Sequence, residues 1–158
     1  MKSQLLNKIR TVEEKDVLKS EINKLLDSLY TEKGSGFESA LKSKVRFWVS
    51  EIIKSEVNND YIEIEGYLKA VLENLDKFEV VSVKIAFEPT DSAIDRFFNF
   101  IKTEVGEMVI MAFELDRKIL GGAVISYKGD YRDLSLKRLF EDEYEAKRDE
   151  VMKIMYSR

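Results

Sequence analysis

The spacing of apolar residues changes at Glu79, and this change limits the folds open to the chain more than any other feature. Before it, apolar residues recur every three or four positions, as they do on one face of a helix. Val81, Val83, Ile85 and Phe87 then alternate with Ser82, Lys84 and Ala86, which is the period of a half-buried strand. The pattern predicts an α+β protein, with a helical N-terminal part at residues 1–77 and a second domain at residues 78–158.

The N-terminal part is predicted to hold three main helices after a short opening turn. Thr11 and Glu14 fit a capping box at the start of the first helix. Glycines at 34 and 36 predict a turn between the first and second helices. The three apolar stripes are Leu18, Ile22, Leu25, Leu26 and Leu29; Leu41, Val45, Trp48, Val49, Ile52 and Ile53; and Tyr67, Leu68, Val71, Leu72 and Leu75. We expect these stripes to pack together or against a partner.

The second domain is predicted to have the order β-α-β-β-α. Its first strand ends before Pro89, and Thr90 or Asp91 can cap the helix that follows. Strands are expected at about 108–115 and 123–127, and a final helix near Ser135. We expect the stripe of Leu136, Leu139 and Phe140 to lie largely on the sheet, with the charged later turns projecting beyond the domain.

Composition excludes several functions. The chain has no cysteine and no histidine, so it lacks disulfides, thiolate zinc sites and imidazole bases. Its net charge is −4, and neither half has the basic excess that nucleic-acid binding requires. Phosphate-binding glycine motifs are absent, as is any apolar stretch of the ~20 residues needed to cross a bilayer. We therefore expect no enzyme activity, cofactor, metal, nucleic-acid partner or direct membrane insertion.

One C-terminal motif points to a family. An apolar residue and an aspartate precede two apolar residues and a Gly-Gly pair, and a strand, a glycine and an Asp-x-Ser follow. The residues concerned are Leu115-Asp116, Ile119-Leu120, Gly121-Gly122, Val124-Ile125, Gly129 and Asp133-Leu134-Ser135. This motif resembles the C-terminal signature of the ATP synthase delta subunit, called OSCP in mitochondria, and the likeness extends over about residues 79–140.

The resemblance implies a non-catalytic stator subunit that joins the catalytic head to the peripheral stalk and resists the torque of rotation. Its partners would be the stalk subunit b, or its equivalent, and the alpha subunits of the head. Its location would be cytoplasmic, peripheral to the inner face of the membrane. Delta subunits usually carry six N-terminal helices, more than the stripes of residues 1–77 predict.

The signature residues themselves are expected to shape the fold. Gly121, Gly122 and Gly129 permit positive φ angles or close backbone approach, and Asp133 and Ser135 can accept hydrogen bonds where the last helix begins. Asp116 belongs to the same signature. A partner-binding seam is predicted farther along that helix, where Val151, Ile154 and Met155 recur at i, i+3 and i+4.

Other functions remain open. The E subunit of V/A-type ATPases also combines a helical N-terminal part with a mixed domain containing Gly-Gly, although its later motif is usually Asn-Thr-Leu. A related export-apparatus stator is another variant. A free-standing protein-binding module would expose an edge or groove of the same sheet. The Asp-x-Ser of this chain favours the delta subunit.

Overall fold

The computed structural model describes residues 3–30, 35–57 and 61–156. It is an α+β fold, as the sequence predicted. Contacts divide the chain into two compact units, one made of Met1–Glu79 with Phe98–Ile110 and the other of Val80–Phe97 with Met111–Arg158.

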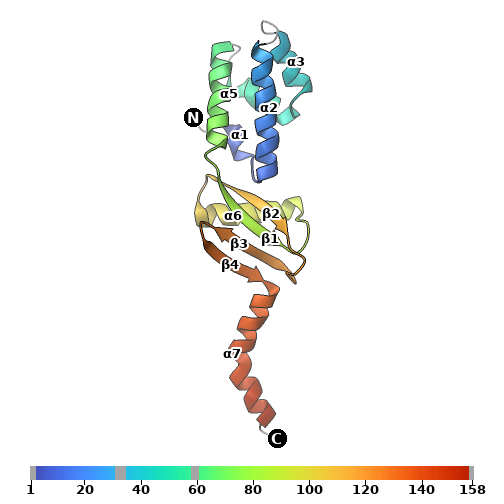
Figure 1. Ribbon diagram of the computed structural model, residues 1–158, viewed down its shortest axis with the longest axis vertical. Coiled ribbons are helices and arrows are strands. Elements are labelled where there is room, and N and C mark those ends of the chain that lie inside the picture. The colour runs from blue at the N-terminus through green and yellow to red at the C-terminus, as the bar shows by residue number, and fades with distance from the viewer. Residues whose placement is uncertain (1–2, 31–34, 58–60, 157–158) are drawn as a thin grey trace. The chain divides into compact units, whose positions relative to one another are not determined.

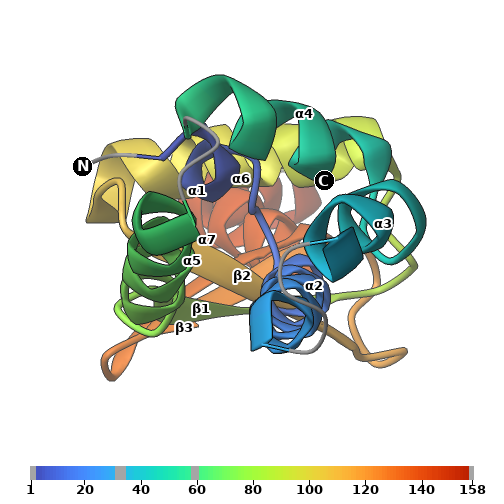
Figure 2. The same cartoon turned by 90° about the horizontal axis from the view of Figure 1, so that it is seen from above.

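The first unit contains a bundle of five helices. These are α1 (Gln4–Asn7), α2 (Val12–Tyr30), α3 (Ser35–Ser43), α4 (Phe47–Glu56) and α5 (Tyr61–Leu75). The long helices α2 and α5 lie side by side, and Figure 2, seen from above, shows α3 and α4 beside them. Fully buried Leu18, Ile22, Leu25 and Leu68 form the centre of the core. Each such side chain contributes about 1.5–3 kcal/mol to stability by leaving water.

The predicted helix through Leu41 and Ile53 is wrong, because the chain breaks between α3 and α4. The cause is the buried carboxylate of Glu21 on α2. It accepts hydrogen bonds from the backbone N–H of Arg46 at 2.8 Å and from the guanidinium of Arg46 at 2.8–3.1 Å. This holds Arg46 in extended backbone as the residue before α4. A tertiary contact therefore overrides the helical spacing of Val45.

The sheet has four strands in the order β2-β1-β3-β4, where β1 is Glu79–Ile85, β2 Val109–Leu115, β3 Gly122–Tyr127 and β4 Asp130–Ser135. The backbone N–H of Glu79 donates a hydrogen bond to the carbonyl of Met108, and that of Asp116 donates one to the carbonyl of Ile85. Strands β1 and β2 therefore run parallel, and α6 (Asp91–Val105) connects them. Strand β3 is antiparallel to both β1 and β4.

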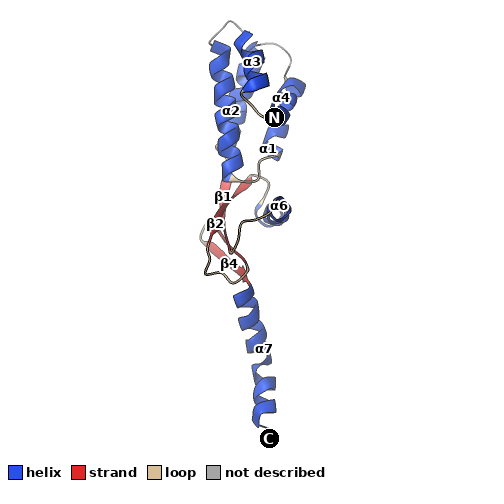
Figure 3. Ribbon diagram, turned by 90° about the vertical axis from the view of Figure 1, so that its right-hand side faces the viewer, coloured by secondary structure: helices blue, strands red, loops and turns tan. Residues whose placement is uncertain are grey.

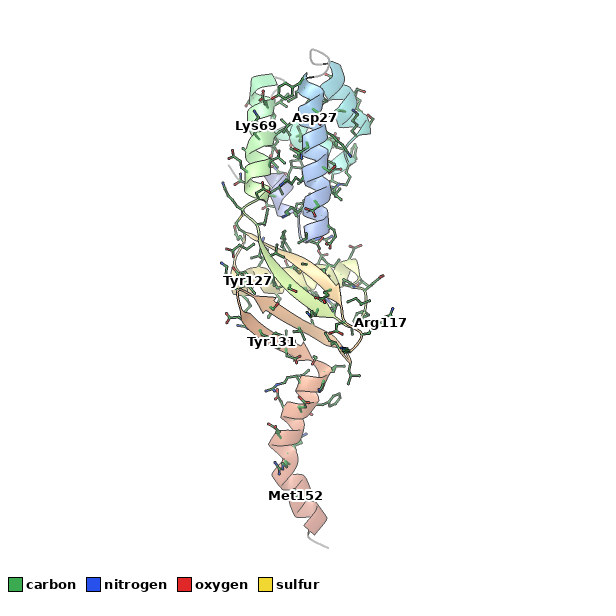
Figure 4. All side chains as sticks on the ribbon, viewed as in Figure 1. Asp27, Lys69, Arg117, Tyr127, Tyr131 and Met152 are labelled. Carbon is green, nitrogen blue, oxygen red and sulfur yellow. The ribbon has the colours of Figure 1, made fainter. Side chains whose placement is uncertain are left out.

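Strand β4 is an element that the sequence analysis did not predict. It forms a hairpin with β3 through Lys128 and Gly129, whose φ angles of 48° and 91° suit a two-residue type I′ turn. Tyr127 and Tyr131, labelled in Figure 4, lie on the two strands of this hairpin. The domain order is therefore β-α-β-β-β-α.

Helix α6 lies beside one face of the sheet (Figure 3). The rings of Phe97 on α6 and Phe113 on β2 meet edge to face, with centroids 6.3 Å apart. Buried Val81, Val83 and Ile85 alternate along β1 as the strand pattern predicted. The last helix, α7 (Leu136–Tyr156), follows β4 without an intervening loop (Figure 1).

The expected burial of the α7 stripe is wrong. Leu136, Leu139 and Phe140 are all exposed, as is every other α7 residue whose side chain the structure describes. The reason is that β4 runs straight into α7, so the helix extends beyond the sheet instead of folding back across it. Its apolar residues remain available to a partner.

Candidate partner-binding site

Asp116 turns the chain after β2. Its Oδ1 accepts a hydrogen bond from the backbone N–H of Lys118 at 2.9 Å, and its carbonyl accepts one from Ile119 at 3.1 Å. These bonds fold residues 116–119 into a tight turn that leads to the Gly-Gly pair. The Asp116 carboxylate therefore stabilises the local turn of the backbone.

Gly121 and Gly122 allow β3 to approach the end of β4 and the start of α7. Both have positive φ angles, 146° and 80°. A Cβ atom on Gly122 would stand 2.3 Å from the carbonyl oxygen of Leu134, and one on Gly121 would stand 2.7 Å from Cδ1 of Leu136. Any larger residue at Gly122 collides with backbone, which cannot rotate away.

Ser135 ends β4 and caps α7. Its Oγ accepts a hydrogen bond from the backbone N–H of Arg138 at 3.3 Å, which satisfies a donor in the first helical turn. The Oδ1 of Asp133 in turn accepts the N–H of Ser135 at 2.9 Å. Hydrogen bonding by the side chain and the backbone N–H of Ser135 lowers the pKa of Asp133. Asp133 lies in strand β4, whereas the sequence analysis placed it in a loop.

The signature residues do not form a single cluster. Gly122 pairs with Ser135 in the β3–β4 register, so the Gly-Gly pair, Asp133 and Ser135 share the end of the sheet where α7 begins. Gly129 lies in the hairpin turn at the opposite end of the same strands, with open space around it. Its role concerns only the turn.

Exposed apolar side chains gather at the end of the sheet where α7 begins. We call this set the end surface: Leu120, Leu134, Leu136, Leu139 and Phe140. Leu120 is 77% exposed and Phe140 68%. Exposed apolar side chains that lie near one another are typical of binding sites, since their contact with water is unfavourable.

Sequence reasoning did not assign Leu120 and Leu134 to a binding surface. Leu120 directly precedes the Gly-Gly pair, and Leu134 lies on an edge strand that the sequence pattern did not reveal. The available signal was a leucine directly before the Gly-Gly pair and another within the Asp-x-Ser motif.

The predicted seam of Val151, Ile154 and Met155 is described only in part. The backbone of α7 continues as helix through these positions, but their side chains lie outside the described residues. The neighbouring Met152, labelled in Figure 4, is 40% exposed. The seam therefore stays a prediction.

Within the described ranges, no group of three or more Asp or Glu residues is placed to hold a metal ion. None of the helices there combines the length and apolar character that crossing a membrane requires. No protein-family model matches the chain, and no curated protein matches it.

Proposed function

We propose that the chain is a non-catalytic stator subunit of a rotary ATP synthase, similar to the delta subunit or OSCP. The observation that carries the proposal is the end surface, an exposed apolar area built directly on the Gly-Gly and Asp-x-Ser signature. A stator must hold a partner tightly while torque acts on it. Apolar contact supplies such binding without a cofactor or a chemical step.

The bundle of α1 to α5 favours a delta-type subunit over an E-type stalk subunit. An E-type subunit needs a long helical N-terminal segment to form part of the stalk. In this chain α2 and α5 instead pack together, and fully buried Leu18 and Leu68 belong to the same core. An export-apparatus stator and a free-standing binding module remain the alternatives.

In the proposed arrangement, the end surface holds a helix of stalk subunit b or its equivalent, and the helical bundle faces the alpha subunits of the head. The subunit then works on the cytoplasmic side, peripheral to the membrane through the complex. The chain has no catalytic role there.

A binding assay with purified stalk subunit b tests this proposal. We expect the intact chain to bind b, and the Phe140→Glu variant to bind at least about tenfold more weakly, because a charge enters the apolar contact. Tyr131→Glu is the matched control. Tyr131 is 66% exposed, and it lies three residues from Leu134 on the same strand, so it points to the opposite face of the sheet.

Equal loss of binding in the Phe140→Glu and Tyr131→Glu variants, both folded, would remove the end surface as the contact. Absence of binding by the folded intact chain would contradict the proposed function itself. Circular dichroism on each variant identifies the folded ones.

A further inference from the structure

The helical unit contains a pocket beside α5 with a volume of about 230 Å³. Its walls are apolar and include the buried side chains of Val57, Tyr67 and Val71, while Gly66 and Ala70 lie exposed at its opening. An apolar cavity of about 150 Å³ is enough to bind benzene. This pocket can therefore hold one aromatic ring with a short side chain.

Gly66 keeps the pocket open. It lies in the interior of α5, where glycine is among the least favourable residues. A Cβ atom at Gly66 would meet no atom within 4 Å, and Gly66 is not among the glycines with a positive φ angle. Neither close packing nor the backbone conformation therefore requires glycine at this position. What the glycine provides is the open space of the pocket.

The pocket is negatively charged. Among the described residues, two carboxylates line it, those of Glu56 and Glu63, and no lysine or arginine does. Burial raises the pKa of Glu56, but hydrogen bonds from Tyr67, the N–H of Gln4 and Ser3 outweigh it and lower that pKa below 4.5, so the group is ionised at pH 7. The carboxylate of Glu63 is exposed and has no hydrogen bond or ion pair within the described ranges.

The lysines on and after α5 do not neutralise these two carboxylates. Lys69 donates a hydrogen bond to Glu65, which does not line the pocket. Lys77 donates one to Oδ1 of Asn74 at 3.4 Å. Asn74 lines the other end of the pocket, about 16 Å farther along the helix than Glu63. The end of the pocket that holds the carboxylates is therefore left to attract a cation.

We propose that this pocket binds a small organic cation, in which an apolar group is joined to a protonated amine. The apolar group contacts Val57 and Val71, and the ammonium lies beside the carboxylates of Glu56 and Glu63. Hydrogen bonds between an ammonium and a carboxylate are stronger than those between neutral groups. The site belongs to the helical unit, and the inference does not depend on the stator proposal.

Two ligands of the same size test the inference. 2-Phenylethylamine is protonated at pH 7, and 2-phenylethanol carries a neutral hydroxyl in place of the ammonium. In NMR titrations of the intact chain, the amide signals of Gly66 and Ala70 report binding at this pocket. We expect these signals to shift saturably with the amine, with a Kd at least about tenfold lower than for the alcohol.

Glu63→Gln should weaken binding of the amine at least about threefold and leave binding of the alcohol unchanged. Glu38→Gln is the matched control, because it makes the same charge change at an exposed residue of α3 that does not line the pocket. It should change neither Kd.

Gly66→Leu should abolish binding of both ligands, because the leucine side chain fills the pocket. Its melting temperature should not fall, since leucine favours a helix more than glycine does. Circular dichroism checks the fold. Where this variant does not fold, the comparison of Glu63→Gln with Glu38→Gln decides alone.

Absence of a saturable shift at Gly66 and Ala70 with the amine would overturn the inference, as would equal dissociation constants for amine and alcohol. A folded Gly66→Leu variant that binds the amine as the intact chain does would place binding elsewhere and overturn it too. An effect of Glu38→Gln as large as that of Glu63→Gln would trace the preference to the overall charge of the chain and equally contradict a specific site.

Discussion

The carbonyl oxygen of Gly121 accepts a hydrogen bond from the backbone N–H of Leu136 at 3.0 Å. This bond joins the loop before β3 to the first residue of α7, and the side chain of Leu136 lies over the position where a Cβ atom of Gly121 would stand. The Gly-Gly pair therefore fixes where α7 starts and which apolar residues its first turn presents.

Gly122→Ala should destabilise the protein more than Gly129→Ala. Both glycines have positive φ angles, 80° and 91°, so each substitution costs about 1–2 kcal/mol in backbone strain. Only Gly122 adds a collision with the carbonyl of Leu134, whereas Gly129 has open space. We expect a clearly lower melting temperature for the Gly122 variant, and a valine at each position should widen the gap. Equal melting temperatures would show that the close approach is unimportant.

Phe98→Ala should lower the free energy of unfolding by about 3–5 kcal/mol, because the ring is buried and its loss leaves a cavity. Phe100→Ala on the same helix provides the control. Phe100 is 42% exposed against 8% for Phe98, and its loss should cost less than about 1 kcal/mol. Urea unfolding measures both values. Similar losses for the two variants would mean that the buried face of α6 is assigned wrongly.

Sequence reasoning predicted part of this fold. Helical spacing predicted the buried side chains of α2, α5 and α6, since a repeat of 3.6 residues places them on one face. It failed at Arg46, where Glu21 breaks the helix from 25 positions away. It also missed β4 (Asp130–Ser135). An edge strand can consist largely of polar residues, and it then lacks the apolar alternation that identifies a strand in the sequence.

The end surface could not be predicted from the sequence, for a similar reason. An apolar stripe on a helix predicts burial, but it does not say whether the chain buries it or a partner does. Leu139 and Phe140 have the spacing of core residues, yet the direct passage from Ser135 into α7 leaves them exposed. Only tertiary geometry distinguishes these two outcomes.

Acid should weaken the helical unit through Glu56. Burial raises the pKa of Glu56, but hydrogen bonds from Tyr67 at 2.6 Å, the N–H of Gln4 at 2.8 Å and Ser3 at 2.8 Å together hold that pKa below its ordinary 4.5. A carboxyl group whose folded pKa is lowered stabilises the fold fully above pH 4.5. This stabilisation disappears as the pH falls through the lower folded value.

Tyr67→Phe removes one of these donors, so the variant should lose less stability than the intact chain as the pH falls below the ordinary pKa of 4.5. At pH 7 it should be less stable by about 1 kcal/mol, a modest value because the carboxylate is partly exposed. Urea unfolding at a series of pH values gives both quantities, and Tyr131→Phe should leave them unchanged. Parallel pH profiles for Tyr67→Phe and the intact chain would exclude Glu56 as the titrating group.

Truncation after Lys147 should leave the fold intact and weaken binding of the stalk subunit. The removed segment includes the predicted seam of Val151, Ile154 and Met155 but none of the end surface. Circular dichroism checks the fold, and capture of b on immobilised protein checks binding. Unchanged capture would restrict the contact to the end surface or move it to the N-terminal helices.

Co-purification of the tagged chain from detergent-solubilised membranes of its own cells tests the stator proposal most directly. The account predicts that stalk subunit b and the alpha subunits of the head are recovered in fixed stoichiometry with the chain, and that Phe140→Glu reduces this recovery while Tyr131→Glu does not. Recovery of the folded chain without any ATP synthase subunit, or with a different complex, would contradict the assignment.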